Sequence, residues 1–125
     1  MVDTFLIDSH KAIYHPERVA VINNYVANPQ EPEAREAYKS MMPLYMEVSP
    51  VGACNHRCTF CSVDYIGYKS IFLDPKIYKA SIEQNNVQFP IKSIMFAGEG
   101  EPLLHKGISE FLSINNANSI ESSSP

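Results

Sequence analysis

Three cysteines lie within eight residues of one another and are the only cysteines of the chain. Cys54, Cys58 and Cys61 stand in a C-x3-C-x2-C arrangement. Thiolate is the usual protein ligand for the iron of an iron–sulfur cluster. Each iron of a cubane [4Fe–4S] cluster needs a terminal ligand, so three cysteines on one loop leave one iron open. An open coordination position marks a catalytic metal site, and the spacing therefore predicts a cluster that binds and activates a small molecule.

Two other metal-binding classes compete for the same cysteines. Three thiolates together with His56 or His105 would make a Cys3His zinc site. Zinc modules favour two separated pairs of ligands, whereas His56 lies between two of the cysteines on a short loop. An electron-transfer iron–sulfur protein would use a fourth cysteine, which the chain does not have. The cluster with an open iron is therefore the preferred interpretation, and zinc remains the alternative.

Alternating and apolar patterns predict the elements that position the cysteines. Residues 44–49 predict a strand that ends just before them, and residues 91–97 predict a second strand, apolar enough to be covered on both faces. Between the two, Asp74-Pro75 marks the start of a helix to about residue 85 that buries Ile77 and Ile82 with help from Tyr78. The order strand, cysteine loop, helix, strand is a parallel βαβ unit, in which ligands bind at the carboxyl ends of the strands.

A second polar loop follows the second predicted strand. Residues 98–102 read GEGEP, and apolar residues at helical spacing then predict a helix over residues 104–112. Glycine lets a backbone approach a ligand closely, and a glutamate there can accept a hydrogen bond from an ammonium group. Both loops fall at the carboxyl ends of parallel strands, so topology alone predicts that they lie near each other.

Residues 54–61, CNHRCTFC, resemble the signature of the radical S-adenosylmethionine (radical SAM) superfamily, which has C-x3-C-x-aromatic-C after its first strand. Phe60 fills the aromatic position. Residues 94–102, IMFAGEGEP, are similar to the family's motif of glycine and glutamate at the end of the second strand. The family typically has G-G-E-P there, whereas Glu99 separates the two glycines in this chain.

The resemblance implies an enzyme whose cofactors are a [4Fe–4S] cluster on the three cysteines and S-adenosylmethionine (SAM) on the fourth iron. An external one-electron donor of flavodoxin or ferredoxin type would reduce the cluster, and SAM would be cleaved to methionine and a 5′-deoxyadenosyl radical that abstracts hydrogen from the substrate. No side chain of the protein is assigned a catalytic role. The residues that the resemblance implies in cofactor binding are Phe60, Gly98, Glu99, Gly100 and Glu101, with Glu101 as the nearer carboxylate and Glu99 second.

The fold that the resemblance implies is α/β, an incomplete (β/α) radical SAM partial barrel of about two βα units preceded by a short helical extension. At about 30 residues per unit, the family's six units need about 180 residues, which exceeds the 125 of this chain. We therefore expect an extension over residues 1–43, the amino-terminal part of the core over 44–112, and a polar, disordered tail over 113–125. A truncated fragment would need the missing carboxyl-terminal half, and an inactive fragment is the alternative to an enzyme.

The extension contains two proline-initiated helical patterns, over residues 16–26 and 32–41, and its residues 4–7 predict either an edge strand or an extended segment. These helices either pack against the outside or bottom of the barrel or recognise substrate. Three further side chains have open roles: His105 as a loop hydrogen-bond donor or helix cap, and Tyr65 and Tyr68 as cavity-lining or packing residues.

Composition limits the setting and the partners. The net charge of −4 argues against general nucleic-acid binding, and no run of residues predicts a signal peptide or a membrane span. Three cysteines in a chain of this length do not indicate a disulfide scaffold, so we expect a cytoplasmic protein. The substrate stays unknown: the G-x-G-E-P form, which also occurs in radical SAM RNA methyltransferases, favours RNA, the acidic charge disfavours it, and peptide modification is equally open.

Overall fold

The computed structural model of the chain describes residues 11–62, 65, 67, 69–84 and 87–123. The edge strand considered at residues 4–7 and the side chain of Tyr68 lie outside these residues. No helix in the described part of the chain is long and apolar enough to cross a membrane.

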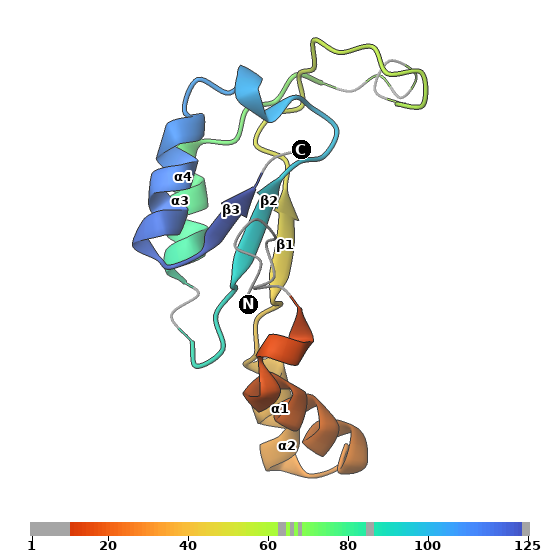
Figure 1. Cartoon of the computed structure of the whole chain (residues 1–125), viewed down its shortest axis with the longest axis vertical. Coiled ribbons are helices and arrows are strands. Elements are labelled where there is room, and N and C mark those ends of the chain that lie inside the picture. Colours follow the sequence, from red (N-terminus) through yellow and green to blue (C-terminus); the bar gives the residue numbers. More distant parts are fainter. Residues whose placement is uncertain (1–10, 63–64, 66, 68, 85–86, 124–125) are drawn as a thin grey trace, which may run out of the picture.

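A three-stranded parallel sheet lies at the centre of the described structure (Figure 1). Its strands are β1 (Tyr45–Val48), β2 (Ser93–Phe96) and β3 (Glu121–Ser123), in the order β1-β2-β3. Helices α3 (Pro75–Glu83) and α4 (Ile108–Ala117) make the crossover connections. The predicted α/β class and the first two strands are confirmed. The register pairs the last residues of β1 and β2, so the loops that leave these strands begin side by side.

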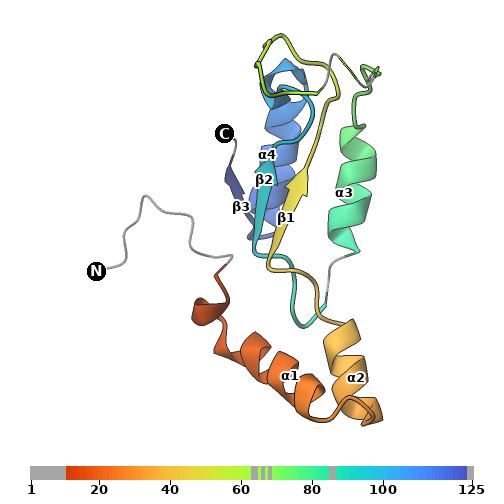
Figure 2. The same cartoon turned by 90° about the vertical axis from the view of Figure 1, so that its right-hand side faces the viewer.

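Helices α3 and α4 cover one face of the sheet (Figures 1 and 2). Alternation along β2 sends Ile94 and Phe96 to this face, where neither keeps more than 1% of its surface exposed. They contact Phe111 of α4 and the buried side chains of α3, and the aromatic rings of the cluster meet at tilted or edge-to-face angles. The buried cluster consists of Tyr78, Ile82, Ile91, Ile94, Phe96, Phe111 and Ile120. This core holds the carboxyl ends of β1 and β2 in place.

The buried face of α3 differs by one residue from the sequence prediction. Tyr78 and Ile82, four residues apart, are buried at 4% and 3% exposure, whereas Ile77 keeps 61% of its surface exposed. Residues at i and i+4 share a helix face, so a face centred on Tyr78 turns Ile77 outwards. The second expected helix is also displaced: residues 102–104 form a 3-10 turn, and α4 begins at Ile108 and continues beyond residue 112 to Ala117.

The prediction of a polar, disordered tail over residues 113–125 is wrong for residues 113–123. The last five residues of α4 and the strand β3 lie in this part of the chain. Asn115 is fully buried; its side-chain oxygen accepts a hydrogen bond from the Tyr78 hydroxyl and its amide donates to Ser122 Oγ at 2.9 Å. Ile120 is buried in the core just before β3. A polar sequence is ordered here because its buried groups bind one another.

We expect stability to fall at alkaline pH through Tyr78. Burial raises the pKa of Tyr78 to about 12, with the hydrogen bond to Asn115 acting in the opposite direction. The unfolded chain has a tyrosine pKa of about 10, so the folded state holds this proton more tightly. The contribution of this proton to the free energy of unfolding is therefore complete below about pH 10. It is lost between about pH 10 and pH 12, at up to about 1.4 kcal/mol per pH unit. Urea unfolding at about pH 9 and about pH 11 measures it, and an equal decline in Tyr78→Phe would contradict the assignment.

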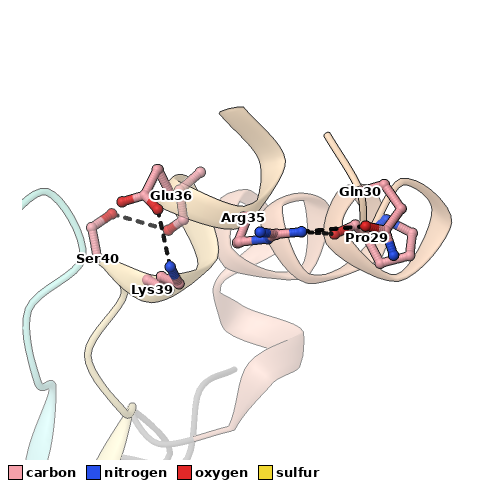
Figure 3. Close-up of polar contacts among 7 residues, drawn as sticks. Pro29, Gln30, Arg35, Glu36, Lys39 and Ser40 are labelled. Carbon is pink, nitrogen blue, oxygen red and sulfur yellow. Dashed lines mark hydrogen bonds and ion pairs between the residues drawn. The ribbon is translucent and has the colours of Figure 1, made fainter. Parts of the chain in front are cut away.

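Helices α1 (Pro16–Ala27) and α2 (Pro32–Lys39) form a hairpin before β1, as the two proline signals predict. Both figures place the hairpin at the amino ends of the strands, away from the cysteine loop (Figures 1 and 2). Arg35 donates to Pro29 O at 3.2 Å in the turn of the hairpin, and Lys39 pairs with Glu36 at 3.1 Å within α2 (Figure 3). Within the described residues, the hairpin is thus remote from the motif loops, which favours packing at the bottom of the core over direct substrate recognition.

Arg18 connects this hairpin to the core. Its side chain is 2% exposed, donates to Met42 O at 2.7 Å and to Pro90 O, and lies over the ring of Phe89. Met42 precedes β1 and Pro90 precedes β2, so one guanidinium joins α1 to the starts of both strands. Arginine suits this position because its planar group offers several donors in fixed directions.

Replacing Arg18 by methionine is expected to lower the free energy of unfolding by about 3 kcal/mol, because two carbonyls lose a charged donor. Urea denaturation of the two proteins measures the difference. Arg35→Met is the matched control, since Arg35 makes its contacts at the exposed turn of the hairpin and should cost no more than about 1 kcal/mol. Equal losses in the two variants would show that Arg18 does not anchor the hairpin.

Candidate metal centre

The cysteines lie on a long loop that leaves β1 at the carboxyl edge of the sheet (Figure 1, yellow to green). The root of this loop is closed by backbone pairing between residues 50–52 and 71–73. Gly52 N donates to Ile71 O at 2.7 Å, and Leu73 N donates to Pro50 O at 2.9 Å. Val51, at 1% exposure, is buried in this root. The part of the loop that carries the cysteines is therefore fixed at its base and projects from the end of the sheet.

The glycines of the second motif lie directly against the root of the cysteine loop. A methyl group on Gly100 would come 1.9 Å from Val51 O and 2.8 Å from Ala53 O, so only glycine fits. Gly98 has a φ of +124°, and a methyl group there would lie 2.8 Å from Ser49 Cβ. Two segments more than forty residues apart in the sequence thus meet backbone to backbone, which confirms that the two loops are neighbours.

Glu101 contacts the cysteine loop through two of its groups and its own loop through a third. Its backbone N–H donates to Ala53 O at 2.9 Å. Its Oε1 accepts from the N–H of Leu103 at 3.0 Å and so caps the 3-10 turn at residues 102–104. Its Oε2 lies 3.1 Å from His56 Nε2, in the middle of the first cysteine gap. The carboxylate of Glu101 therefore lies between the two motifs, whereas Glu99 is exposed.

The three thiols are accessible and form no disulfide. Cys58 is exposed, and Cys54 and Cys61 are partly exposed. Cys61 N donates to Cys58 O at 3.1 Å, so these two cysteines share one turn. Among the described residues, no three His, Cys, Asp or Glu side chains are close enough together to bind a metal ion as the loop stands.

The chemistry of the donor set fits an iron–sulfur cluster. Three thiols without disulfide partners lie within eight residues on an accessible loop, and thiolate is the ligand that such iron prefers. The sulfurs would have to converge when metal binds, which is ordinary for sites whose binding and ordering are coupled. Cys54, Cys58 and Cys61 are thus the residues that would hold the cluster.

The aromatic side chains that the structure describes on this loop are exposed. Phe60 keeps 91% of its surface exposed, so the alternative that it is a core aromatic is wrong. Tyr65, at 88%, does not line a cavity in this arrangement. A cavity of about 680 Å³ does lie beside the loop root, lined in part by Ser49, Gly52 and Phe72, which leaves room for a small molecule at this edge of the sheet.

His105 has a structural role. Its Nδ1 accepts from the N–H of Gly107 at 3.0 Å, so the proton is on Nε2, which donates to Leu73 O at 2.9 Å. The ring is 7% exposed and meets Phe111 edge-on. Of the two roles considered for it, His105 has that of a loop hydrogen-bond donor; it does not cap α4, whose N-cap residue is Gly107 and which has no side-chain cap hydrogen bond. With both nitrogens engaged, it is a poor fourth ligand for zinc.

Some partners at the site carried no sequence signal. Ser49 and Ala53 contact the second motif only through small groups or backbone, and such contacts depend on the fold rather than on residue type. The link between His56 and Glu101 likewise joins residues 45 positions apart.

The fold and the site define an α/β protein with a parallel sheet and two interlocked loops at its carboxyl edge, one bearing three thiols and the other a glycine-flanked carboxylate. Comparison of the chain with models of known protein families, with curated proteins and with solved structures gave no match.

Proposed function

We propose that the chain is a radical SAM enzyme, or part of one, that binds a [4Fe–4S] cluster through Cys54, Cys58 and Cys61 and SAM at the open iron. The observation that carries the proposal is the contact between the two loops. Gly100 lies against the backbone of Val51 and Ala53 so closely that no side chain fits, and this contact brings a carboxylate beside the thiol loop.

Each group of the site has a task in this proposal. The three thiolates bind three irons, and the reduced cluster, when bound, supplies the electron that breaks a carbon–sulfur bond of SAM to give methionine and a 5′-deoxyadenosyl radical. Glu101 accepts a hydrogen bond from the ammonium group of SAM through a carboxylate oxygen. Gly98 and Gly100 allow the second motif to lie against the root of the cysteine loop, and this contact keeps Glu101 beside the thiols.

The remaining parts of the proposal concern setting and partners. Thiols that bind iron must stay reduced, which suits a cytoplasmic protein. An external one-electron donor of flavodoxin or ferredoxin type would reach the cluster at the exposed loop. Phe60, exposed on this loop, would cover the cluster once it is loaded. The substrate is a peptide or an RNA in this proposal.

Anaerobic reconstitution with iron and sulfide, followed by metal analysis, tests the class of site. About four irons and four sulfides per chain are expected from a [4Fe–4S] cluster. Incubation with SAM and dithionite should then release 5′-deoxyadenosine, detected by chromatography. Binding of one zinc in preference to iron would instead identify the chain as a zinc module, and a cluster that leaves SAM intact would identify an inactive iron–sulfur protein.

A further inference from the structure

We propose that His56 is a positioning residue that occupies the SAM-binding oxygen of Glu101 until the cluster loop is loaded. In the chain without its cluster, the imidazole would hold the cysteine loop against the second motif and block the carboxylate of Glu101. Loading would release it. The inference rests on the proposed function, and it concerns the contact of 3.1 Å between His56 Nε2 and Glu101 Oε2.

The position of Glu101 does not depend on His56. Its backbone is held by Ala53 O, and its Oε1 is held by the N–H of Leu103. Only Oε2 faces the histidine. If the imidazole leaves, the carboxylate therefore stays in place with one oxygen free, ready to accept a new donor without reordering.

Access to that oxygen is limited while His56 is present. The side chain of Glu101 keeps 23% of its surface exposed, and the imidazole lies against the oxygen that does not cap the turn. An ammonium group would need a distance of about 2.7–2.9 Å to the same oxygen. The two donors thus compete for one place.

His56 can leave at small cost. Its side chain is 59% exposed, and within the described part of the chain it interacts only with Glu101. Exposed pairs of this kind shift an equilibrium by about 1.5- to 5-fold.

Cluster binding would release His56 from Glu101 by rearranging the segment that carries the histidine. His56 lies between Cys54 and Cys58, whose sulfurs must converge with that of Cys61 when a cluster binds, since they do not form a metal-binding group as the loop stands. Rearrangement of this segment would carry the imidazole away from Glu101. Cluster loading and SAM binding would therefore favour each other, because coupling between two sites is reciprocal.

Two measurements on the full chain test the proposal. Amide hydrogen exchange of residues 54–61 in the cluster-free protein should be faster in His56→Ala than in the unmodified chain. Cluster formation at limiting iron and sulfide should be favoured about 1.5- to 5-fold in His56→Ala, because loading no longer has to break the contact, whereas SAM binding to the reconstituted variant should equal that of the unmodified chain. His56→Gln retains an N–H donor and should lie between the two. Thr59→Ala, an exposed change in the same loop, is the control and should change neither quantity.

The outcomes separate this inference from the proposed function. Unchanged or weaker cluster formation in His56→Ala, with normal cluster formation and SAM binding in the unmodified chain, would overturn the role of His56 and leave the proposed function intact. An unchanged rate of amide hydrogen exchange at residues 54–61 in His56→Ala would also overturn the role of His56, since the contact with Glu101 would then not order the cysteine loop. Failure of the reconstituted, unmodified chain to bind SAM would overturn both.

Discussion

Replacing Cys54, Cys58 or Cys61 by alanine is expected to abolish retention of the iron–sulfur cluster. Partners outside the ligand sphere already contribute about 10- to 100-fold to metal affinity, so loss of a ligand should cost at least as much. Iron and sulfide are measured after reconstitution and desalting of each single variant. The fold itself should be little affected, because none of the three side chains belongs to the buried core.

Ser62→Ala is the matched control for the cysteine variants, since it changes an exposed side chain beside the last cysteine without touching a sulfur. It should retain iron and sulfide at the level of the unmodified chain. Full retention of the cluster in any of the three cysteine variants would remove that residue from the ligand set. The expected stability of the metal-free variants, within about 0.5 kcal/mol of the unmodified chain, is checked by urea unfolding.

The second large effect is expected at Gly100. In Gly100→Ala, the new methyl group would lie 1.9 Å from Val51 O, and neither backbone segment can yield without breaking the contact between the loops. We expect a loss of about 3 kcal/mol or more in the free energy of unfolding, because an overpacked site that cannot relax has costs of this size. SAM binding by the reconstituted protein should be lost as well, since Glu101 would move with the loop.

Gly67 offers a matched control for this substitution. It has a φ of +64° and nothing within 4 Å of an added methyl group, so Gly67→Ala introduces backbone strain without a clash. Its cost should be about 1–2 kcal/mol, the ordinary penalty of the left-handed conformation. If Gly100→Ala is no more destabilising than Gly67→Ala, the close approach of the two loops is not as the structure describes.

Much of the framework was predictable because local signals and tertiary structure agree. Proline at the first turn marks α1, α2 and α3, and apolar runs mark β1 and β2. Parallel topology then places both motif loops at one edge, whatever the details of packing. The three thiols and the glycine-flanked carboxylate were therefore expected to be neighbours before any contact was known.

The third strand was not predictable in the same way. Residues 113–123 are rich in serine and asparagine, which is typical of disorder, and β3 has no apolar alternation. Its order depends on Asn115, whose partners Tyr78 and Ser122 are distant from it in sequence or separated from it by a turn. Such a buried polar network forms only once the helices are packed, so a composition-based prediction failed here.

The side-chain contacts within the site also could not be predicted from the sequence. The pattern identified Glu101 and the cysteines but not the orientation of any side chain. That His56 meets Glu101, that Gly100 touches Val51, and that Phe60 is exposed all depend on how two irregular loops lie against each other. Loops lack the periodicity from which a buried face can be inferred.

The most direct test of the central claim is electron paramagnetic resonance of the reconstituted, reduced chain with and without SAM. The proposal of a three-cysteine cluster with an open iron predicts a [4Fe–4S]⁺ signal that changes when SAM is added, because SAM would bind the iron that no cysteine holds. A reconstituted cluster whose signal is indifferent to SAM would contradict the assignment of the open iron as the SAM site. Absence of a cluster, with zinc bound instead, would contradict the metal assignment itself.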